Sequence, residues 1–600
     1  MATTVQTARP RNVNMWRAAA ILYGDLGTSK AYVLGLAFAL AAYSSFWYIF
    51  AVGLLTLLVG INYTTICRLF PNGGGVYSTA RARSKALSLV GAFFLIADYL
   101  VTAALSSLSA FNYLGVAYPE IWAVAAILFI GLLNFLGPKH TGSMAIALAL
   151  PTLLIVFLLG LISLPFLPAA IKNLSWVSGD IGLDWKIFVG VIVALSGIES
   201  IANTTNSMKL DPGSSYANPR IKKTSTWAIL FVVAEVCVFT SLFGLVMNAL
   251  PGLEISNHEV SAPGYPNVRD AMMRYMGEVF AGEYFGQAVG QFFGLVISVV
   301  IGLLLLSAVN TAMIALISLL YIMSKDEELP GYFQKLNRFG VPIYPTVLMM
   351  VVPSLLILAV SDVLGLANLY AIGFVGAIAV NLGATSTNYN LSMKLWERYL
   401  MLGTFFIMLL VETTLFIDKP QARGFVVAIM GIGLLLRTML KEQKEKKAVE
   451  APVKSSLPQM PAEEEGKDAA MVVVTGLSKS LDYALEMTKK YSIPLYILFV
   501  REQRVLTEAD KNRQWLEDQG ACDVFDYVLD ICHERQLGFL YTVTSHTAFS
   551  ISEVAKQKKV KRIIIDQVRG KYTFINAIRG TTARDISNQI PANIDLIAIY

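Results

Sequence analysis

Two acidic residues inside apolar stretches are the residues of this sequence best placed to do chemistry. Asp25 stands in ILYGDLGTSKAYVLGLAF, between Gly24 and Gly27, and Glu199 stands in VGVIVALSGIESIANTTNS, near Gly197. A carboxylate in a helix that crosses hydrocarbon is costly, so such residues usually line a cavity and mark an ion or substrate path. Glycines permit a helix to unwind, which frees backbone carbonyls to coordinate a cation. We therefore expect two interrupted spanning helices, each bringing one acid to a cation path.

A stripe of hydroxyl groups adds candidate ligands in the segment LIADYLVTAALSSLSAF. Tyr99, Thr102 and Ser106 are spaced by three and four residues, which places them on one face of a helix. Such a stripe serves helix–helix packing in membranes as often as it serves a site, and both interpretations stay open. We expect Asp98 on a different face or near the lipid headgroups, as a proton relay or as the partner of a basic residue.

The remaining polar residues predict no catalytic centre. Glu235 and Glu412 are lone carboxylates in apolar stretches, and we expect them to be paired or near an interface. The four histidines form no cluster, and the four cysteines show no CxxC spacing, as is typical of small buried residues in a reducing cell. With no metal motif and no nucleophile elbow, the sequence predicts that the protein is not an enzyme.

The elements that must position these residues are membrane helices. The chain of 600 residues is 55% hydrophobic and only 15% charged, against about 25% charged residues in soluble domains. A spanning helix needs about 20 mostly apolar residues, and twelve segments qualify: 17–41, 45–68, 87–114, 121–136, 144–166, 186–206, 225–249, 287–323, 343–361, 364–385, 398–417 and 422–440. The first and the sixth carry the glycine-flanked acids, which is the pattern of an inverted repeat of five plus five helices.

The distribution of Lys and Arg predicts the orientation. If the polar, basic tail 1–16 is cytoplasmic, most basic loop residues lie on the inner side, as the positive-inside rule requires. Both termini are then cytoplasmic, and the protein is expected to be a multi-pass protein of the cell (inner) membrane, with the lipid bilayer as its partner. The sequence gives no indication of nucleic-acid binding.

The chain changes character after the last apolar segment. Beyond the transmembrane domain 17–440, residues 441–468 are charged, contain prolines and predict a juxtamembrane linker. In 469–600, strand-like runs such as PLYILFV and RIIID alternate with amphipathic helical segments. That alternation predicts a cytosolic α/β domain with a doubly wound parallel sheet.

Several motifs resemble those of one transporter superfamily. FPNGGGVYSTARA (70–82), NPRIKK and NTAMIALISLLYIMSKDEELPGYFQKLNRFGVPIYPTVL (310–348) are similar to signatures of the amino acid–polyamine–organocation (APC) superfamily. YGDLGTS (23–29) resembles the potassium-uptake (KUP) signature, and the whole layout resembles KimA-type potassium–proton symporters. The resemblance implies an all-α polytopic membrane protein of twelve helices with the LeuT-type inverted repeat.

The resemblance also implies a set of cation-binding residues. Carried over position by position, they fall on Asp25, Tyr32, Tyr99, Thr102, Ser106, Ser196, Glu199 and Tyr370. Potassium would be held by Asp25, Tyr32, Thr102, Ser106 and Glu199. Ser196 stands where the family pattern has Thr, which keeps the hydroxyl group.

Lys30 departs from the family pattern, which usually has proline at that position. If its ammonium group pointed into the cavity, it would repel potassium or stand in for it, and a desolvated lysine could carry the coupled proton. If the side chain extended outward, it would have no part in transport. The proton-coupling candidates are therefore Asp25, Glu199 and Lys30.

The C-terminal domain resembles the universal stress protein fold. Of its nucleotide signature, Gly570, Gly580 and Thr581 are present with the right spacing, whereas Gln567 replaces the first glycine. Backbone amides of such a loop can cradle phosphates, so a bound nucleotide and a purely structural loop are both open. Because stress-type domains often pair, we expect a homodimer through this domain.

These observations favour a secondary active transporter, with proton-coupled potassium uptake by alternating access as the first hypothesis and the cytosolic domain as a regulator. Potassium and protons would be the transported ions, and no covalent cofactor is expected. A proton-coupled amino acid or polyamine permease is the alternative on the same fold. A transporter-like nucleotide sensor is the alternative of another class.

Overall fold

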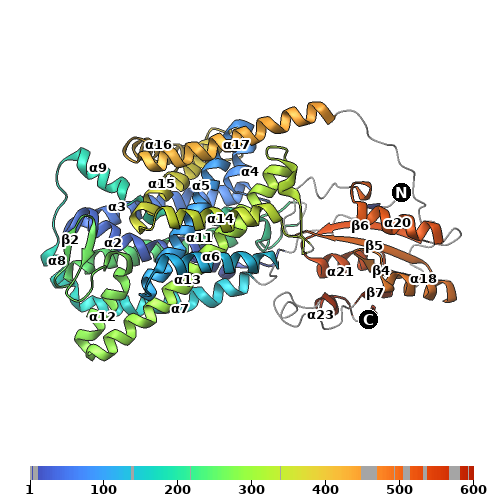
Figure 1. Cartoon of the computed structure of the whole chain (residues 1–600), viewed down its shortest axis with the longest axis horizontal. Coiled ribbons are helices and arrows are strands. Elements are labelled where there is room, and N and C mark those ends of the chain that lie inside the picture. The colour runs from blue at the N-terminus through green and yellow to red at the C-terminus, as the bar shows by residue number, and fades with distance from the viewer. Residues whose placement is uncertain are drawn as a thin grey trace.

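The computed structural model describes residues 3–4, 11–136, 141–215, 218–337, 339–447, 469–491, 493–503, 514–531, 537–566, 582–591 and 593–599. A bundle of helices occupies one end of the molecule, and a sheet flanked by helices occupies the other (Figure 1). The bundle encloses one continuous apolar core, whereas the C-terminal unit has two apolar cores of its own. The division between an apolar helical part and an α/β part follows the change in sequence composition.

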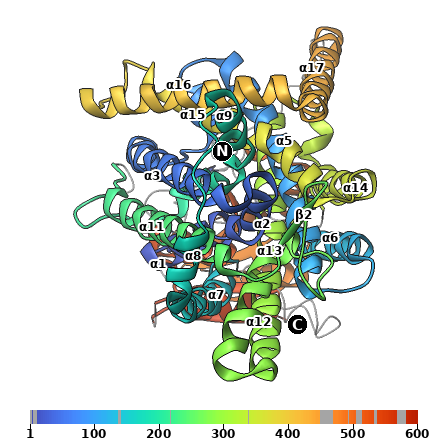
Figure 2. The same cartoon turned by 90° about the vertical axis from the view of Figure 1, so that its left-hand side faces the viewer.

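The bundle is built from helices that begin and end close to the apolar segments of the sequence. Its helices are α1 (Met15–Leu26), α2 (Ser29–Ala41), α3 (Ser45–Leu69), α4 (Val76–Arg81), α5 (Lys85–Leu114), α6 (Pro119–Phe135), α7 (Thr141–Ser163), α8 (Leu167–Asn173), α9 (Ile181–Gly190), α10 (Ser200–Asn203), α11 (Lys222–Val246), α12 (Met272–Phe285), α13 (Gln287–Lys325), α14 (Ile343–Ala359), α15 (Val363–Ser386), α16 (Leu395–Asp418) and α17 (Pro420–Lys447). Seen from the end opposite the C-terminal unit, α2 lies in the middle of the bundle (Figure 2).

In the described part of the chain, eight helical segments are long and apolar enough to cross a membrane, or nine with the bent pair Ile181–Gly190 and Ile192–Asn203. One of the eight, Met15–Leu69, contains both of the first two predicted segments. The shorter apolar helices Pro119–Phe135 and Ile343–Ala359 coincide with the fourth and ninth. The predicted segments therefore fall on helices, except that the sixth falls on the bent pair, and the protein is polytopic, while a count of twelve spans stays a prediction.

The C-terminal unit has a parallel sheet. Its strands are β4 (Ala470–Val474), β5 (Leu495–Glu502), β6 (Leu537–Thr544), β7 (Arg562–Asp566) and β8 (Asp595–Ile599), and its helices are α18 (Lys479–Tyr491), α20 (Gln519–Ile531), α21 (Thr547–Gln557) and α23 (Thr582–Ser587). Alternate residues of β4 belong to different cores: Val472 packs with α18 and α20, whereas Met471 packs with α21. Helices thus cover both faces of the sheet, as the alternating sequence pattern predicts.

The sheet contains one strand that the sequence pattern did not suggest. β1 (Thr3–Thr4) pairs in parallel with β6, which gives the order β1-β6-β5-β4-β7-β8. Arg11 contacts the bundle, because it donates hydrogen bonds to the carbonyl of Thr205 at 3.2 Å and to Asn72 Oδ1 at 2.6 Å. A second contact between the unit and the bundle is the hydrogen bond from Gln503 Nε2 to Tyr321 Oη of α13.

Two further connections differ from simple loops. α17 continues to Lys447, so the first residues of the predicted linker extend the last bundle helix. Between α11 and α13 the chain forms a hairpin of β2 (Glu254–Ser256) and β3 (Glu259–Ser261), then the short helical turn Arg269–Ala271 and α12. This α11–α13 connection lies at the end of the bundle opposite the C-terminal unit (Figure 1).

Candidate functional site

The first interruption separates α1 from α2 right after Asp25. Gly27 and Thr28, which lie between the helices, keep right-handed helical dihedrals, so the span is interrupted without being unwound. The carbonyl of Asp25 accepts a hydrogen bond from Thr28 Oγ1 at 2.6 Å, and that of Leu26 accepts one from Ser29 Oγ at 2.8 Å. We expected free backbone carbonyls in this span. The carbonyls of Asp25 and Leu26 are not free, because neighbouring hydroxyl groups donate hydrogen bonds to them.

The second interruption is a true break in the backbone. The segments Ile181–Gly190 and Ile192–Asn203 are bent by 46°, and Gly197 has a φ of +93°, a left-handed value that favours glycine. A Cβ atom on Gly197 would lie 2.7 Å from the backbone nitrogen of Leu26 and 2.8 Å from the carbonyl carbon of Asp25. Glycine is required here because the two interruptions contact each other directly.

This contact brings together three buried carboxylates, which we call the acidic cluster: Asp25, Asp98 and Glu199. Their residues are 9%, 1% and 2% exposed. Asp98 interacts electrostatically with both Asp25 and Glu199, and Glu199 with Asp25. Asp98 Oδ2 and Glu199 Oε2 have no hydrogen-bond partner. In the described residues no lysine or arginine pairs with any of the three.

Hydroxyl groups from α2 and the second interruption border the acidic cluster. Tyr32 Oη and Ser196 Oγ are 3.2 Å apart, which joins α2 to the residue before Gly197. Tyr32 also interacts electrostatically with Asp25 and Asp98. The side chain of Ser200 lies beside the Asp25 carboxylate.

The hydroxyl stripe of α5 faces the same region at two of its three positions. Thr102 Oγ1 donates to the Asp98 carbonyl at 2.8 Å and lies 3.3 Å from Asp98 Oδ1, and Tyr99 Oη accepts from Asn203 Nδ2 at 2.9 Å. Ser106 is buried one turn farther along α5. Among the residues with known placement, Ser106 has no hydrogen bond to the other candidates.

α15 and α3 complete the surroundings. Tyr370 of α15 interacts electrostatically with Asp98, Tyr32, Glu199 and Asp25, as its inclusion in the candidate set implies. Tyr63 of α3 interacts with Glu199 and accepts a long hydrogen bond of 3.4 Å from Asn381 Nδ2. The sequence carries no signal for Tyr63, since its helix is apolar and has no interruption.

The placement expected for Asp98 is wrong. The structure puts its carboxylate beside Thr102, within the acidic cluster, and not on a separate face or near the headgroups. The four-residue spacing from Asp98 to Thr102 places the two residues on one side of a helix and could have revealed this.

Lys30 lies outside the acidic cluster. Its ammonium nitrogen is 2.8 Å from Glu235 Oε1 of α11, and we call these two residues the Lys30 pair. Glu235 is therefore paired, as the sequence suggested, while Lys30 neither enters the acidic cluster nor extends outward. Glu412 of α16 is buried, and both of its carboxylate oxygens lack a hydrogen-bond partner.

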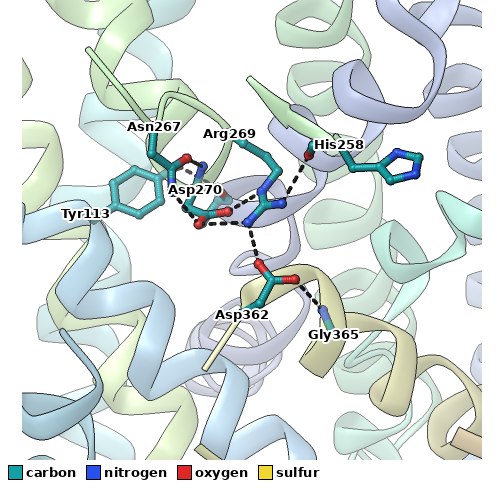
Figure 3. Close-up of polar contacts among 8 residues, drawn as sticks. Tyr113, His258, Asn267, Arg269, Asp270, Asp362 and Gly365 are labelled. Carbon is teal, nitrogen blue, oxygen red and sulfur yellow. Dashed lines mark hydrogen bonds and ion pairs between the residues drawn. The ribbon is translucent and has the colours of Figure 1, made fainter. Parts of the chain in front are cut away.

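A second group of charges, two of them buried, belongs to the α11–α13 connection and the start of α15, and its contacts are drawn in Figure 3. Arg269 of the α11–α13 connection contacts Asp270 and, with its Nη2 atom, Asp362 Oδ1 at 2.5 Å. Asp362 also caps α15 by accepting from the Gly365 nitrogen at 3.0 Å. We call Arg269, Asp270 and Asp362 the Arg269 cluster.

The Arg269 cluster touches two other helices that carry candidate residues. A Cβ atom on Gly35 of α2 would lie 1.9 Å from the Arg269 carbonyl oxygen, so only glycine permits this approach. Tyr113 of α5 lies beside the cluster and donates to the Ala31 carbonyl at 2.6 Å. The α11–α13 connection is thus packed against the middle of α2 and paired with the residue that caps α15.

Two other predictions concern ligands elsewhere. Gly570, Gly580 and Thr581, the proposed nucleotide residues, lie outside the described residues. Among the described residues, no group of three or more His, Cys, Asp or Glu is arranged to hold a metal ion.

Comparisons with known proteins place the chain in a family. Two crystal structures of the Eremococcus coleocola manganese transporter, one of a point mutant and one in complex with an aromatic bis-isothiourea substituted compound, each match 74% of this chain and 98% of theirs at 13% identity and a TM-score of 0.44. Curated protein sequences gave no match. The family model for amino acid permeases matches residues 13–436, which is most of the chain. The protein therefore belongs to the amino acid permease family, and it is a secondary transporter of the membrane and not an enzyme.

Proposed function

We propose that this permease carries potassium into the cell together with protons, by alternating access. The observation that carries the proposal is the acidic cluster, in which Asp25, Asp98 and Glu199 are buried against one another with no basic partner among the described residues. Several buried carboxylates cannot all be ionised unless positive charge joins them. A cation, a proton or both in turn would supply that charge.

The neighbouring groups suit a weakly hydrated cation. Removing the water shell of potassium requires several oxygen ligands. The Tyr32, Ser196, Thr102 and Tyr370 hydroxyls border the carboxylates, and all four residues are buried. Ser106, one turn away on α5, is the weakest member of the candidate set.

Proton coupling follows from the same arrangement. A carboxylate that holds a proton in one state and the cation in the next exchanges the two, and Asp25 and Glu199 are our candidates for this exchange. They lie on the two interruptions, which contact each other at Gly197, so a relative movement of the two spans changes their separation. The Lys30 pair has its own charge balance and supplies no net charge to this exchange.

An organic cation is the second candidate, because the family model is that of amino acid permeases. An amino acid would bring its carboxylate to the acidic cluster, where like charges repel, and Lys30 is bonded to Glu235 instead of screening them. A polyamine carries positive charge without that carboxylate. The acidic cluster therefore favours a polyamine over an amino acid within this family.

The membrane and the orientation that we propose for the protein are inferred from its sequence. The basic residues of the loops favour cytoplasmic termini in the cell (inner) membrane. The C-terminal unit would then face the cytosol as a regulator and as the contact of a homodimer.

Growth at limiting potassium tests the proposal, in cells that lack their own potassium uptake. Wild-type protein should restore growth and potassium uptake, and a protonophore should abolish the uptake. Asp25→Asn and Glu199→Gln should each abolish uptake, whereas Glu412→Gln, a buried carboxylate outside the acidic cluster, should retain it. Restored growth with Asp25→Asn would contradict the proposal, and proton-dependent uptake of spermidine without potassium uptake would select the second candidate.

A further inference from the structure

Lys30 is a fully buried cation in the middle of the bundle. It is 0% exposed and sits in α2, one residue after the helix begins at Ser29. A desolvated ammonium group is unstable unless an anion and hydrogen-bond acceptors surround it. The groups that surround the Lys30 ammonium therefore indicate the role of its charge in the protein.

Glu235 and Tyr23 supply those partners. The Lys30 nitrogen lies 2.8 Å from Glu235 Oε1 and 2.9 Å from Glu235 Oε2, and it donates to Tyr23 Oη at 3.2 Å. Tyr23 Oη in turn donates to Glu235 Oε1 at 3.2 Å, and the Tyr23 ring centroid is 5.0 Å from the ammonium. These three side chains form a closed triangle of hydrogen bonds with no net charge.

The triangle crosses the first interruption. Tyr23 belongs to α1, Lys30 to α2 and Glu235 to α11, so both halves of the interrupted span are attached to one carboxylate of a third helix. At the interruption itself, the amides of Thr28 and Ala31 bond three residues back, to Asp25 and Thr28, where an α-helix would bond four residues back. Such a local change of helix type often marks a hinge.

In the described chain, no hydrogen bond or ion pair joins the triangle to the acidic cluster. The three hydrogen bonds of the Lys30 ammonium go to Tyr23 and to the two carboxylate oxygens of Glu235. Lys30 therefore does not occupy the place of the transported cation.

We propose that Lys30 is a positioning residue: with Glu235 and Tyr23 it fixes the angle between α1 and α2 and so presents Asp25 to the cation path. The proposal rests on the transport function proposed above. It assigns Lys30 no proton-carrying step and no contact with the substrate. The first span retains helical dihedrals through its interruption, so a clamp from outside the span can define how the two halves meet.

A double-mutant cycle on the purified protein and in cells tests this role. Lys30→Met and Glu235→Leu each leave one buried ion alone, and each should lower the melting temperature and reduce potassium uptake at least tenfold. Lys30→Met/Glu235→Leu removes both ions and should restore uptake to within about threefold of wild type, with an unchanged dependence on external pH. The exchanged pair Lys30→Glu/Glu235→Lys keeps the two charges and serves as a second rescue variant.

Lys30→Arg separates positioning from simple stability. It keeps the charge but changes the length and shape of the clamp, so Vmax should fall several-fold while KM for potassium stays near wild type. The proposal is overturned if neither double variant is more stable than both single variants, or if a folded double variant takes up potassium without proton coupling. Melting temperatures do not depend on transport. A wild-type protein that takes up no potassium would contradict the proposed function, whereas the melting temperatures of the single and double variants would still test whether Lys30, Glu235 and Tyr23 act as a clamp.

Discussion

The two groups of buried charge around the first span differ in one respect: the Lys30 pair contains its own counter-charge, and the acidic cluster does not. Glu235 receives two of the three hydrogen bonds of the Lys30 ammonium, while Asp98 Oδ2 and Glu199 Oε2 receive none. A buried ion pair completed by the protein holds helices together. Several buried carboxylates gathered at the two interruptions without a counter-charge remain able to take up a cation from outside. That distinguishes them from a structural contact and from a lone buried carboxylate such as Glu412.

The Arg269 cluster belongs with the Lys30 pair in this comparison. Its guanidinium is shared by Asp270 and Asp362, and it joins the α11–α13 connection to α15. Both groups contain a cation supplied by the protein, and we call them balanced, although Arg269 serves two carboxylates. The acidic cluster has no such cation among the described residues, and we call it unbalanced. Mutations that remove one charge should consequently have opposite profiles in the two kinds of group: loss of transport in the unbalanced one, and loss of stability in the balanced ones.

After the loss of uptake expected for Asp25→Asn and Glu199→Gln, the largest effect is expected for Asp98→Asn. The variant keeps the shape of the side chain but removes a charge that faces the cation, so potassium uptake should fall about a hundredfold, equivalent to about 3 kcal/mol of lost interaction. Removing an uncompensated buried carboxylate should leave the melting temperature unchanged or higher. Initial uptake rates and thermal melts of the same preparation check both parts. Wild-type uptake by a correctly inserted Asp98→Asn protein would remove Asp98 from the site.

The sequence predicted the unbalanced group better than the balanced ones. Asp25 and Glu199 can be recognised in the sequence because a charged residue beside glycine is rare in an apolar segment. In the structure, the two interruptions that carry them are in contact. The pairing of Lys30 with Glu235 joins residues 205 positions apart. No local spacing relates those positions, so only the packing of α2 on α11 could reveal the pair.

The details of the interruptions were less predictable for a different reason. The sequence shows glycines in both spans, but only Gly197 takes a left-handed conformation, while Gly27 stays helical. Which glycine leaves the helical conformation depends on the segment that packs against it. Here the backbone of Asp25 and Leu26 packs against Gly197. Strand β1 was not predicted because two residues are too few to show the alternating pattern of a strand. It is recognised as a strand only by its pairing with β6.

A second prediction concerns the Arg269 cluster, where stability should respond more than the transport of the folded protein. Arg269→Ala leaves Asp270, which is 6% exposed, without its cation, so it should cost about 3 kcal/mol of stability. Asp362 is half exposed, and Asp362→Asn should cost about 1 kcal/mol or less. Thermal or denaturant unfolding in detergent measures both.

Lys186→Ala is the control for the Arg269 cluster. Lys186 and Asp418 form an exposed pair at 3.5 Å, so its loss should change stability by less than about 0.5 kcal/mol. Equal costs for Arg269→Ala and Lys186→Ala would show that the Arg269 cluster is no more than a surface contact.

The smallest effects, and the most direct comparison, come from two tyrosines of the same span. Tyr32 Oη lies 3.2 Å from Ser196 Oγ beside the acidic cluster, and Tyr23 Oη lies 3.2 Å from Glu235 Oε1 in the Lys30 pair. Tyr32→Phe removes one candidate ligand, so KM for potassium should rise about fivefold, as expected for a hydrogen bond worth about 1 kcal/mol.

Tyr23→Phe removes two hydrogen bonds around the Lys30 pair, one donated to Glu235 and one accepted from Lys30, and none from the acidic cluster. It should lower the melting temperature slightly and leave KM for potassium within about twofold of wild type, because the bonds of Lys30 to Glu235 remain. Uptake measured over a range of potassium concentrations, together with a melt of each variant, separates the two results. If Tyr23→Phe raised KM as much as Tyr32→Phe does, the Lys30 pair would belong to the cation path, and the distinction between balanced and unbalanced charge would no longer identify the site.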